Sequence, residues 1–208
     1  MDIIRHTNHL GNDIIMSDLI FNPILNPKEM LEAGIFGGSY FGVEDLQGDY
    51  DYQSLFAECL DGISPSLYLG KKYSPKMNKF KIRSGMPYDY WLEMDWMHHD
   101  DPYGWFEWYC KYSNGRRHED DDRQIRRWQD FCGPGRGRWR NAIYKKIHLS
   151  SDWTISPRIQ QSLLHWGYYV NDDDYLFWCE LNRIEPIDLY NEDEWCEYGG
   201  LPSPKAYE

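Results

Sequence analysis

The residues that could do chemistry concentrate in the middle of the chain. His98 and His99 are followed by Asp100 and Asp101, and imidazole and carboxylate are donors that Zn²⁺ accepts. Adjacent residues point in different directions, however, whereas good metal sites use residues one helical turn apart or on distant segments. We therefore expect no metal here. The pattern favours a helix capped by Asp100 or Asp101, with Pro102 in its first position.

Basic residues form a second candidate site. The segment 71–146 holds 17 bases and 11 acids, and it lies between two acidic flanks, so the net charge of −12 hides a basic centre. Arginine offers planar, bidentate contacts to phosphate, which predicts a focused surface for nucleic acid or another anionic partner. The alternative is that neighbouring acids neutralise these arginines in a surface network of little energetic value. The candidate residues are Arg116, Arg117, Arg123, Arg126, Arg127, Arg136, Arg138, Arg140, Lys71 and Lys72.

Aromatic residues make up 17% of the chain, so rings are expected to carry much of the core. Trp105, Trp108, Tyr109 and Tyr112 recur at the spacing of one helical face. Together with Trp128 they form a predicted aromatic pocket on which a base could stack.

Acid–base catalysis has only scattered candidates: Asp101, Asp122 and His165. His165 lies in an apolar helical stretch, which is more typical of a hydrogen-bonded core residue than of a catalyst. No motif for a nucleophile, metal or cofactor accompanies them, so no cofactor is expected.

The elements that must position these residues are predicted to be helices. Asn114 and Gly115 end a helix that carries the aromatic face, and acids at 119–122 open the next one, which gives an αα-hairpin near 102–131. The expected fold class is mainly α: a single compact domain of several short helices around an aromatic-rich core, with irregular loops. Its parts are an N-terminal arm or short helix at 1–20, a core helical domain at 21–170 and an acidic, aromatic C-terminal extension at 171–208.

Two further segments have a clear pattern. Asn26 and Pro27 start a short helix that Gly34 ends. The glycines of 34–42 then predict a tight turn with close backbone approach, since neither a preceding strand nor the ending of a phosphate-binding loop is present.

The five cysteines are widely spaced and contain no C-x-x-C pair, which favours reduced, buried thiols in an intracellular protein, in the cytoplasm or nucleus. No apolar run is long enough for a membrane span, and the first residues lack the pattern of a secretory signal.

The central sequence resembles a family of uncharacterised proteins of eukaryotes and large DNA viruses. The matching pieces are GIFGGSYF at 34–41, DDPYGWFEWYCKY at 100–112, GRR at 115–117, DRQIRRW at 122–128 and LLHWGYY at 163–169. The resemblance implies a common fold and a common site, and a viral origin as one expectation. It implies no particular chemistry, because the family has no assigned activity.

These observations favour a non-enzymatic intracellular protein whose central Arg/Lys surface (71–146) engages nucleic acid or another anionic partner. One alternative is a structural or interaction subunit of a larger, possibly viral assembly, with a protein partner bound through residues 171–208. The other alternative is an enzyme acting on a nucleotide or modified base in the aromatic pocket.

Overall fold

The computed structural model describes residues 5–7, 13–15, 21–42 and 57–187, and these residues are predominantly helical. Two 3₁₀ turns, at Pro65–Leu67 and Pro75–Met77, interrupt the loops of the first half. The regular elements of the described residues are β1 (Arg5–Thr7), β2 (Asp13–Ile15), α1 (Pro27–Glu32), α3 (Ala57–Leu60), α4 (Tyr88–Glu93), α5 (Trp105–Ser113), α6 (Asp121–Cys132), α7 (Arg138–Ser150), α8 (Pro157–Leu164) and α9 (Asp172–Asn182).

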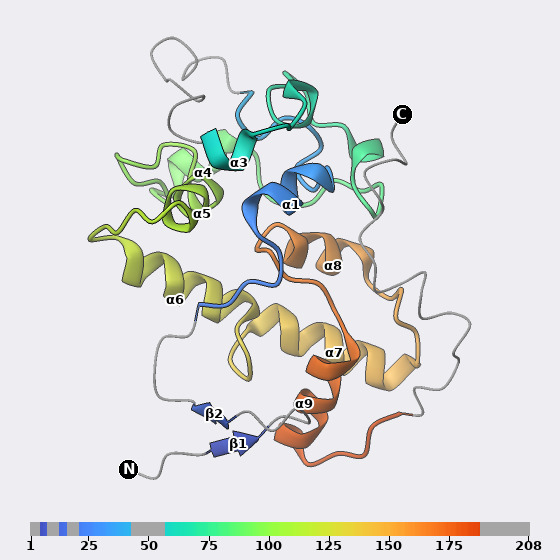
Figure 1. Cartoon of the computed structure of the whole chain (residues 1–208). Helices are drawn as coiled ribbons and strands as arrows, with labels where there is room; N and C mark the ends of the chain where they lie inside the picture. Colours follow the sequence, from blue (N-terminus) through green and yellow to red (C-terminus); the bar gives the residue numbers. More distant parts are fainter. Residues whose placement is uncertain (1–4, 8–12, 16–20, 43–56, 188–208) are drawn as a thin grey trace.

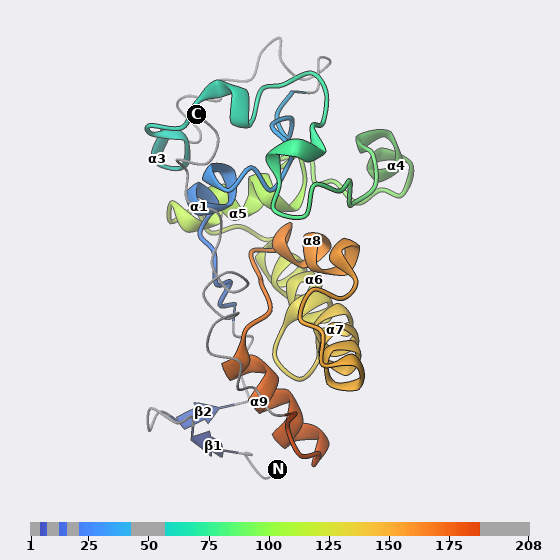
Figure 2. The same ribbon diagram turned by 90° about the vertical axis from the view of Figure 1, so that its right-hand side faces the viewer.

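Helices α6 and α7 form the axis of the molecule. They follow one another across the view of Figure 1, with α1, α3 and α8 on one side and α9 on the other. Helix α4 stands out from the body beside α5 and α8 (Figure 2), and it contains no buried residue. The expectation of a mainly helical domain around an aromatic core is confirmed.

The core is built from rings, as the composition predicts. Phe21, itself partly buried, packs against this core, with five aromatic side chains arranged edge-on around it at centroid distances of 5.3–6.4 Å. These five rings come from α5 and α6, so a single residue of the N-terminal segment joins the two helices. The five are Trp105, Trp108, Tyr109, Tyr112 and Trp128.

Helix α1 begins as predicted. The Asn26 side chain accepts the Glu29 N–H at 2.9 Å and the Glu29 carboxylate accepts the Asn26 N–H at 2.8 Å, which completes a capping box. The turn that follows has its predicted close approaches: a Cβ on Gly34 would lie 2.2 Å from the Met77 carbonyl oxygen, and one on Gly42 2.0 Å from that of Gly70. Only glycine fits at these two positions.

The predicted start of α5 is wrong. The helix begins at Trp105, after Gly104 with φ of 81°, and not at Pro102. No side chain among the described residues caps this helix, so the capping role assigned to Asp100 or Asp101 is not filled; the Glu107 carboxylate accepts the N–H of Tyr103, just before the helix, at 2.6 Å. Helix α6 does begin at the predicted acids, and residues 114–120 connect the two helices.

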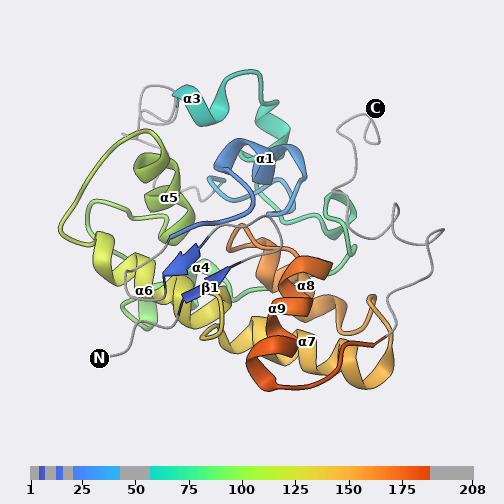
Figure 3. The same cartoon turned by 60° about the horizontal axis from the view of Figure 1, so that its bottom comes forward.

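The terminal segments are described only in part. Within the described N-terminal residues β1 pairs with β2 in antiparallel register, Arg5 opposite Ile15, so the short helix considered for 1–20 is absent there (Figure 3). Threonine and adjacent isoleucines favour this extended backbone. At the other end α9 buries Tyr175 and Trp178. Residues 188–208, which include most of the predicted extension, lie outside the described residues.

Candidate anion-binding cavity

A cavity of about 670 Å³ opens between the glycine turn, α4, the start of α5 and helices α6, α7 and α8. Its walls are mainly aromatic, and α4 contributes the outer, more exposed wall through Trp91 and the nearby Trp96. The aromatic lining residues are Phe36, Tyr40, Trp91, Trp96, Trp105, Phe106, Phe131, Trp139 and Trp166.

Four arginines, Arg83, Arg127, Arg138 and Arg158, line the same cavity, and none of the described lining residues is an aspartate or glutamate. A cavity with four guanidinium groups and no carboxylate has a positive potential, which its low-dielectric walls focus. The arrangement favours an anionic ligand.

Arg127 is the best shielded of these arginines. Its Nη1 donates to the Gln124 Oε1 atom at 2.9 Å, and its guanidinium lies 5.6 Å from the Trp166 ring centre. Within the described residues it has no carboxylate at ion-pair distance. Burial lowers the Arg127 pKa to about 10, so the side chain remains a cation at neutral pH.

Two of the other arginines in the cavity lie over aromatic rings, and the backbone of the third accepts hydrogen bonds. Arg138 lies over Trp139 at 5.0 Å and Arg83 over Tyr73 at 5.6 Å. The carbonyl oxygen of Arg158 accepts hydroxyl groups of Ser84 and Ser162 at 3.2 and 3.0 Å, which fastens the loop before α4 to α8.

His165 lies at the end of α8 and lines the cavity. Its Nε2 is 3.2 Å from the Ile35 carbonyl oxygen, which only accepts hydrogen bonds, so Nε2 carries the proton and Nδ1 presents a lone pair beside Gly85. Burial lowers the His165 pKa to about 4, so the ring is neutral at pH 7. The predicted hydrogen-bonded core histidine is confirmed, and it also borders the cavity.

Two more residues line the cavity wall: Tyr40 is fixed by hydrogen bonds, and Trp105 has an indole N–H that can still donate one. The Tyr40 hydroxyl donates to the Tyr103 carbonyl at 2.7 Å and accepts the Phe106 N–H at 3.3 Å, so this ring is held firmly. The buried indole N–H of Trp105 has no acceptor among the described residues.

Asp101 is neither a helix cap nor an accessible acid. It is fully buried and accepts two hydrogen bonds from Arg116, at 2.8 and 2.6 Å, with Lys111 Nζ at 3.1 Å. Lys111 also contacts Glu107 at 2.6 Å. Two acids and two bases thus form a neutral buried network, in which burial raises the Glu107 pKa. Asp122 is exposed in the first turn of α6, away from this network and from the cavity lining.

Three further predicted arginines are paired with acids. Arg123 contacts Asp120, Arg136 contacts Asp130, and the buried Arg140 contacts Asp174. The account of arginines neutralised by neighbouring acids therefore holds for these three residues, whereas Arg127 and Arg138 line the cavity. Outside both groups, Arg117 lies over the Tyr112 ring at 3.9 Å, and Arg126, Lys71 and Lys72 are exposed.

The predicted aromatic pocket is misplaced. Only Trp105 of its five residues lines the cavity; Trp108, Tyr109 and Trp128 are buried in the core around Phe21, and Tyr112 packs against its edge. Helical periodicity identifies a buried face, but it does not distinguish a wall from a core. The residues that sequence reasoning missed come from four separate segments, so no local spacing could reveal them: Trp91, Trp96, Trp139, Arg158 and Trp166.

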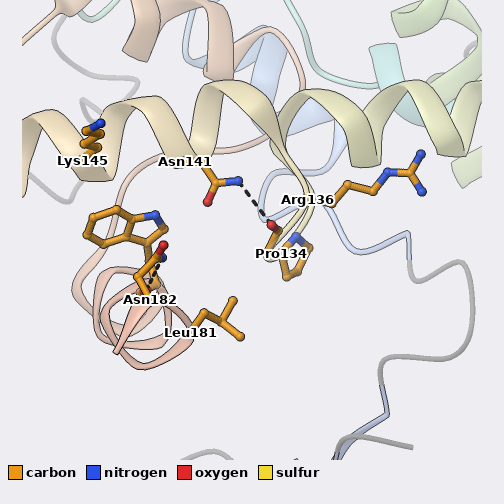
Figure 4. Close-up of a pocket in the computed structure, with 8 residues that line it drawn as sticks. Pro134, Arg136, Asn141, Lys145, Leu181 and Asn182 are labelled. Atoms are coloured by element: carbon orange, nitrogen blue, oxygen red, sulfur yellow. Dashed lines mark hydrogen bonds between the residues drawn. The ribbon is translucent and has the colours of Figure 1, made fainter. Parts of the chain in front are cut away.

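A second cavity, of about 530 Å³, lies between α7, α9 and the turn before α7 (Figure 4). The Asn141 side chain donates to the Gly135 carbonyl at 3.3 Å and the Asn182 side chain to that of Trp178 at 2.7 Å. Arg136 points away from the other lining residues and pairs with Asp130. Lys145 is the other cation among the residues drawn. No set of groups converges there, so the first cavity is the better candidate.

A potential metal-binding cluster lies outside both cavity linings. His98, His99, His118, Asp100 and Glu119 supply groups of donors within 4.8 Å of one another. The sequence argument considered only neighbours and missed His118.

Comparison with protein-family models, with curated proteins and with solved structures gave no match for this chain. Among the described helices, none is long and apolar enough to cross a membrane.

Proposed function

We propose that this protein binds a nucleotide, either free or at an unpaired position of a nucleic acid, in the cavity of about 670 Å³. The observation that carries the proposal is the lining: four arginines, five tryptophans and, among the described lining residues, no carboxylate. Tryptophan faces stack on any base, and guanidinium groups bind phosphate through paired hydrogen bonds. A cavity of this size is in the range of small-molecule sites.

The distribution of charge favours a single nucleotide, or an unpaired one in a nucleic acid, as the ligand. It does not favour the surface of a duplex. With a net charge of −12, the protein as a whole repels a long polyanion. A single nucleotide unit inside the cavity is surrounded by Arg127 and three further arginines, with no carboxylate among the described lining residues. The proposed surface is therefore narrower than the whole Arg/Lys segment 71–146.

Binding is favoured over acid–base catalysis. His165 is the one acid–base candidate of the sequence that lines the cavity, and with a pKa of about 4 it is a weak base at neutral pH. Asp101 is occupied by Arg116, and Asp122 is on the surface. The alternative of a subunit in a larger assembly depends on residues 171–208 and stays a prediction.

The test is a binding titration followed by intrinsic tryptophan fluorescence, because five of the ten tryptophans line the cavity. Nucleoside mono-, di- and triphosphates form one arm, and short single-stranded DNA and RNA form the other. We expect quenching that saturates and weakens with salt. Absence of saturable binding in both arms at low salt would exclude the proposal.

The matched variants are Arg127→Met and Arg126→Met, neighbours on α6 of which only the first lines the cavity. A hydrogen bond to a charged group contributes about 1.5–3 kcal/mol, so Arg127→Met should weaken binding roughly 10- to 100-fold. Arg126→Met should leave it within about 2-fold. Equal losses in the two variants would contradict a site in the cavity.

A further inference from the structure

Three imidazoles surround one carboxylate where the loop before α5 meets the loop after it. The Asp100 Oδ2 atom lies 2.7 Å from His118 Nε2, 3.3 Å from His99 Nε2 and 3.8 Å from His98 Nδ1. The possible ligand atoms of His98, His118 and Glu119 also lie within 4.8 Å of one another. His98, His118 and Asp100 are therefore mutually close, although their loops are separated by a whole helix.

The two loops are held together by the buried ion-pair network. Asp101, which forms a β-bridge with His98, binds Arg116, two residues before His118. The Asp100 carbonyl accepts Lys111 Nζ at 2.6 Å. These contacts fix both sides of the cluster independently of any contact between the imidazoles.

His118 is fixed from its own side as well. Its backbone N–H donates to the Asp121 carboxylate at 2.9 Å, so the loop after α5 is tied to the first turn of α6. The Asp120 N–H donates to His118 Nδ1 at 3.2 Å, which leaves Nε2 to carry the proton and donate it to Asp100. This hydrogen bond from His118 lowers the Asp100 pKa and keeps the carboxyl ionised.

We propose that His98, His118 and Asp100 bind a divalent transition-metal ion of the Zn²⁺ class. Imidazole and carboxylate are the ligands that Zn²⁺ takes in sites with three protein ligands and an open fourth position. Zinc ligands lie about 2.0–2.2 Å from the metal and about 3.4 Å from one another in a tetrahedron. The spacings of 2.7 and 3.8 Å to Asp100 bracket that value, so modest side-chain movements assemble the site.

The fourth ligand is His99, Glu119 or water. The side chains of His98 and His118 are 18% and 17% exposed, whereas that of His99 is 76% exposed and so makes a weaker contribution. On binding, the metal replaces the proton between His118 and Asp100. The neutral ring then carries its one proton on Nδ1, to which it is delivered through solvent, so the ring gives up its hydrogen bond from the Asp120 N–H and no net proton is released.

The test is a titration of the full chain, freed of metal, with Zn²⁺ in competition with a chromophoric chelator. We expect one site per chain, and visible d–d absorption when Co²⁺ replaces Zn²⁺. His118→Gln and Asp100→Asn should each weaken binding by at least about 10-fold, since even outer-shell changes have effects of that size. A wild-type protein without a stoichiometric site would overturn the proposal.

Three other histidines provide matched controls. His148 lies on α7 and contacts the Tyr175 hydroxyl at 2.9 Å, far along the chain from the cluster, so His148→Gln should retain the site. His6 lies in β1 and His9 lies outside the described residues, and the double variant His6→Gln/His9→Gln should also retain the site. Circular dichroism verifies folding of each variant. Unchanged zinc affinity in a folded His118→Gln protein, or loss of the site in either control, would contradict the assignment.

Discussion

Arg116 and Arg127 belong to the same arginine-rich stretch and both are partly buried, but their surroundings differ. Arg116 binds the fully buried Asp101 through two hydrogen bonds, inside a network in which charges balance. Arg127 contacts a neutral glutamine and an indole face, and it lines a cavity that has no carboxylate among its described lining residues. The first arginine connects two loops; the second retains its capacity to bind an anion.

This contrast shows that the position of the acids is more informative than the number of arginines. The same run of acids and bases supplies internal ion pairs and arginines of a positive cavity. Its net charge does not distinguish the paired arginines from those that line the cavity.

The largest effect is expected for Arg116→Met. The variant leaves two acids against one base in a buried network, and breaking a buried pair costs roughly 3–5 kcal/mol of unfolding free energy. Urea denaturation measures the loss. Asp122→Asn, at an exposed acid of α6, is the control and should change stability by less than about 0.5 kcal/mol. A loss below about 1 kcal/mol for Arg116→Met would remove the distinction between the two arginines.

The neutral histidine of the cavity predicts a pH effect. The unfolded chain takes up a proton on His165 near pH 6.5, whereas the folded chain does so only near pH 4, because burial opposes the charged ring. Stability is therefore lost as pH falls through this window, by about 3 kcal/mol at pH 4. His165→Gln should remove that part of the pH dependence. Parallel stability curves for variant and wild type would show that His165 is not buried as a neutral group.

Arg127→Met should change stability little, within about 1 kcal/mol, and in the stabilising direction if at all. A buried cation without an acid opposes folding, and methionine occupies similar space without charge. Thermal and urea denaturation, compared with Arg126→Met, measure the change. A loss as large as that for Arg116→Met would indicate a counter-charge for Arg127 and would weaken the case for a ligand.

The smallest effect is expected for Arg136→Met. Arg136 and Asp130 form an ion pair whose side chains are 60% and 59% exposed, and such pairs contribute about 0–1 kcal/mol. Double-mutant cycles with Asp130→Asn measure the coupling. A coupling free energy comparable to that of the Arg116–Asp101 pair would show that burial does not determine how strongly each ion pair stabilises the fold.

Local patterns in the sequence predicted much of the fold. The capping box at Asn26 and Glu29, the acids that open α6 and the aromatic face of α5 depend on residues a few positions apart. The start of α5 was wrong because the competing interaction of Asp101 with Arg116 is set by tertiary contacts.

The types of residue in the candidate site were predictable from the sequence, but most of its members were not. An arginine surface and an aromatic pocket were predicted separately, and the cavity contains members of both: Arg127 and Arg138 from the first and Trp105 from the second. The remaining walls come from segments whose proximity depends on how α4 and α8 pack, and no periodicity encodes that. The same reason hides His118 from a search around His98 and His99, since the two loops meet only through the folded network.

The segment around Leu25 has a consequence for folding during synthesis. Its carbonyl accepts the Tyr109 hydroxyl, 84 residues later, and its N–H donates to the Gly167 carbonyl. The early glycine turn is likewise bound by Gln161, 126 residues after Ile35. Residues 25–35 are synthesised before α8, so their contacts with Gln161 and Gly167 can form only after α8 has left the ribosome. Folding of the core should be late and slow, because such distant contacts impose a high contact order.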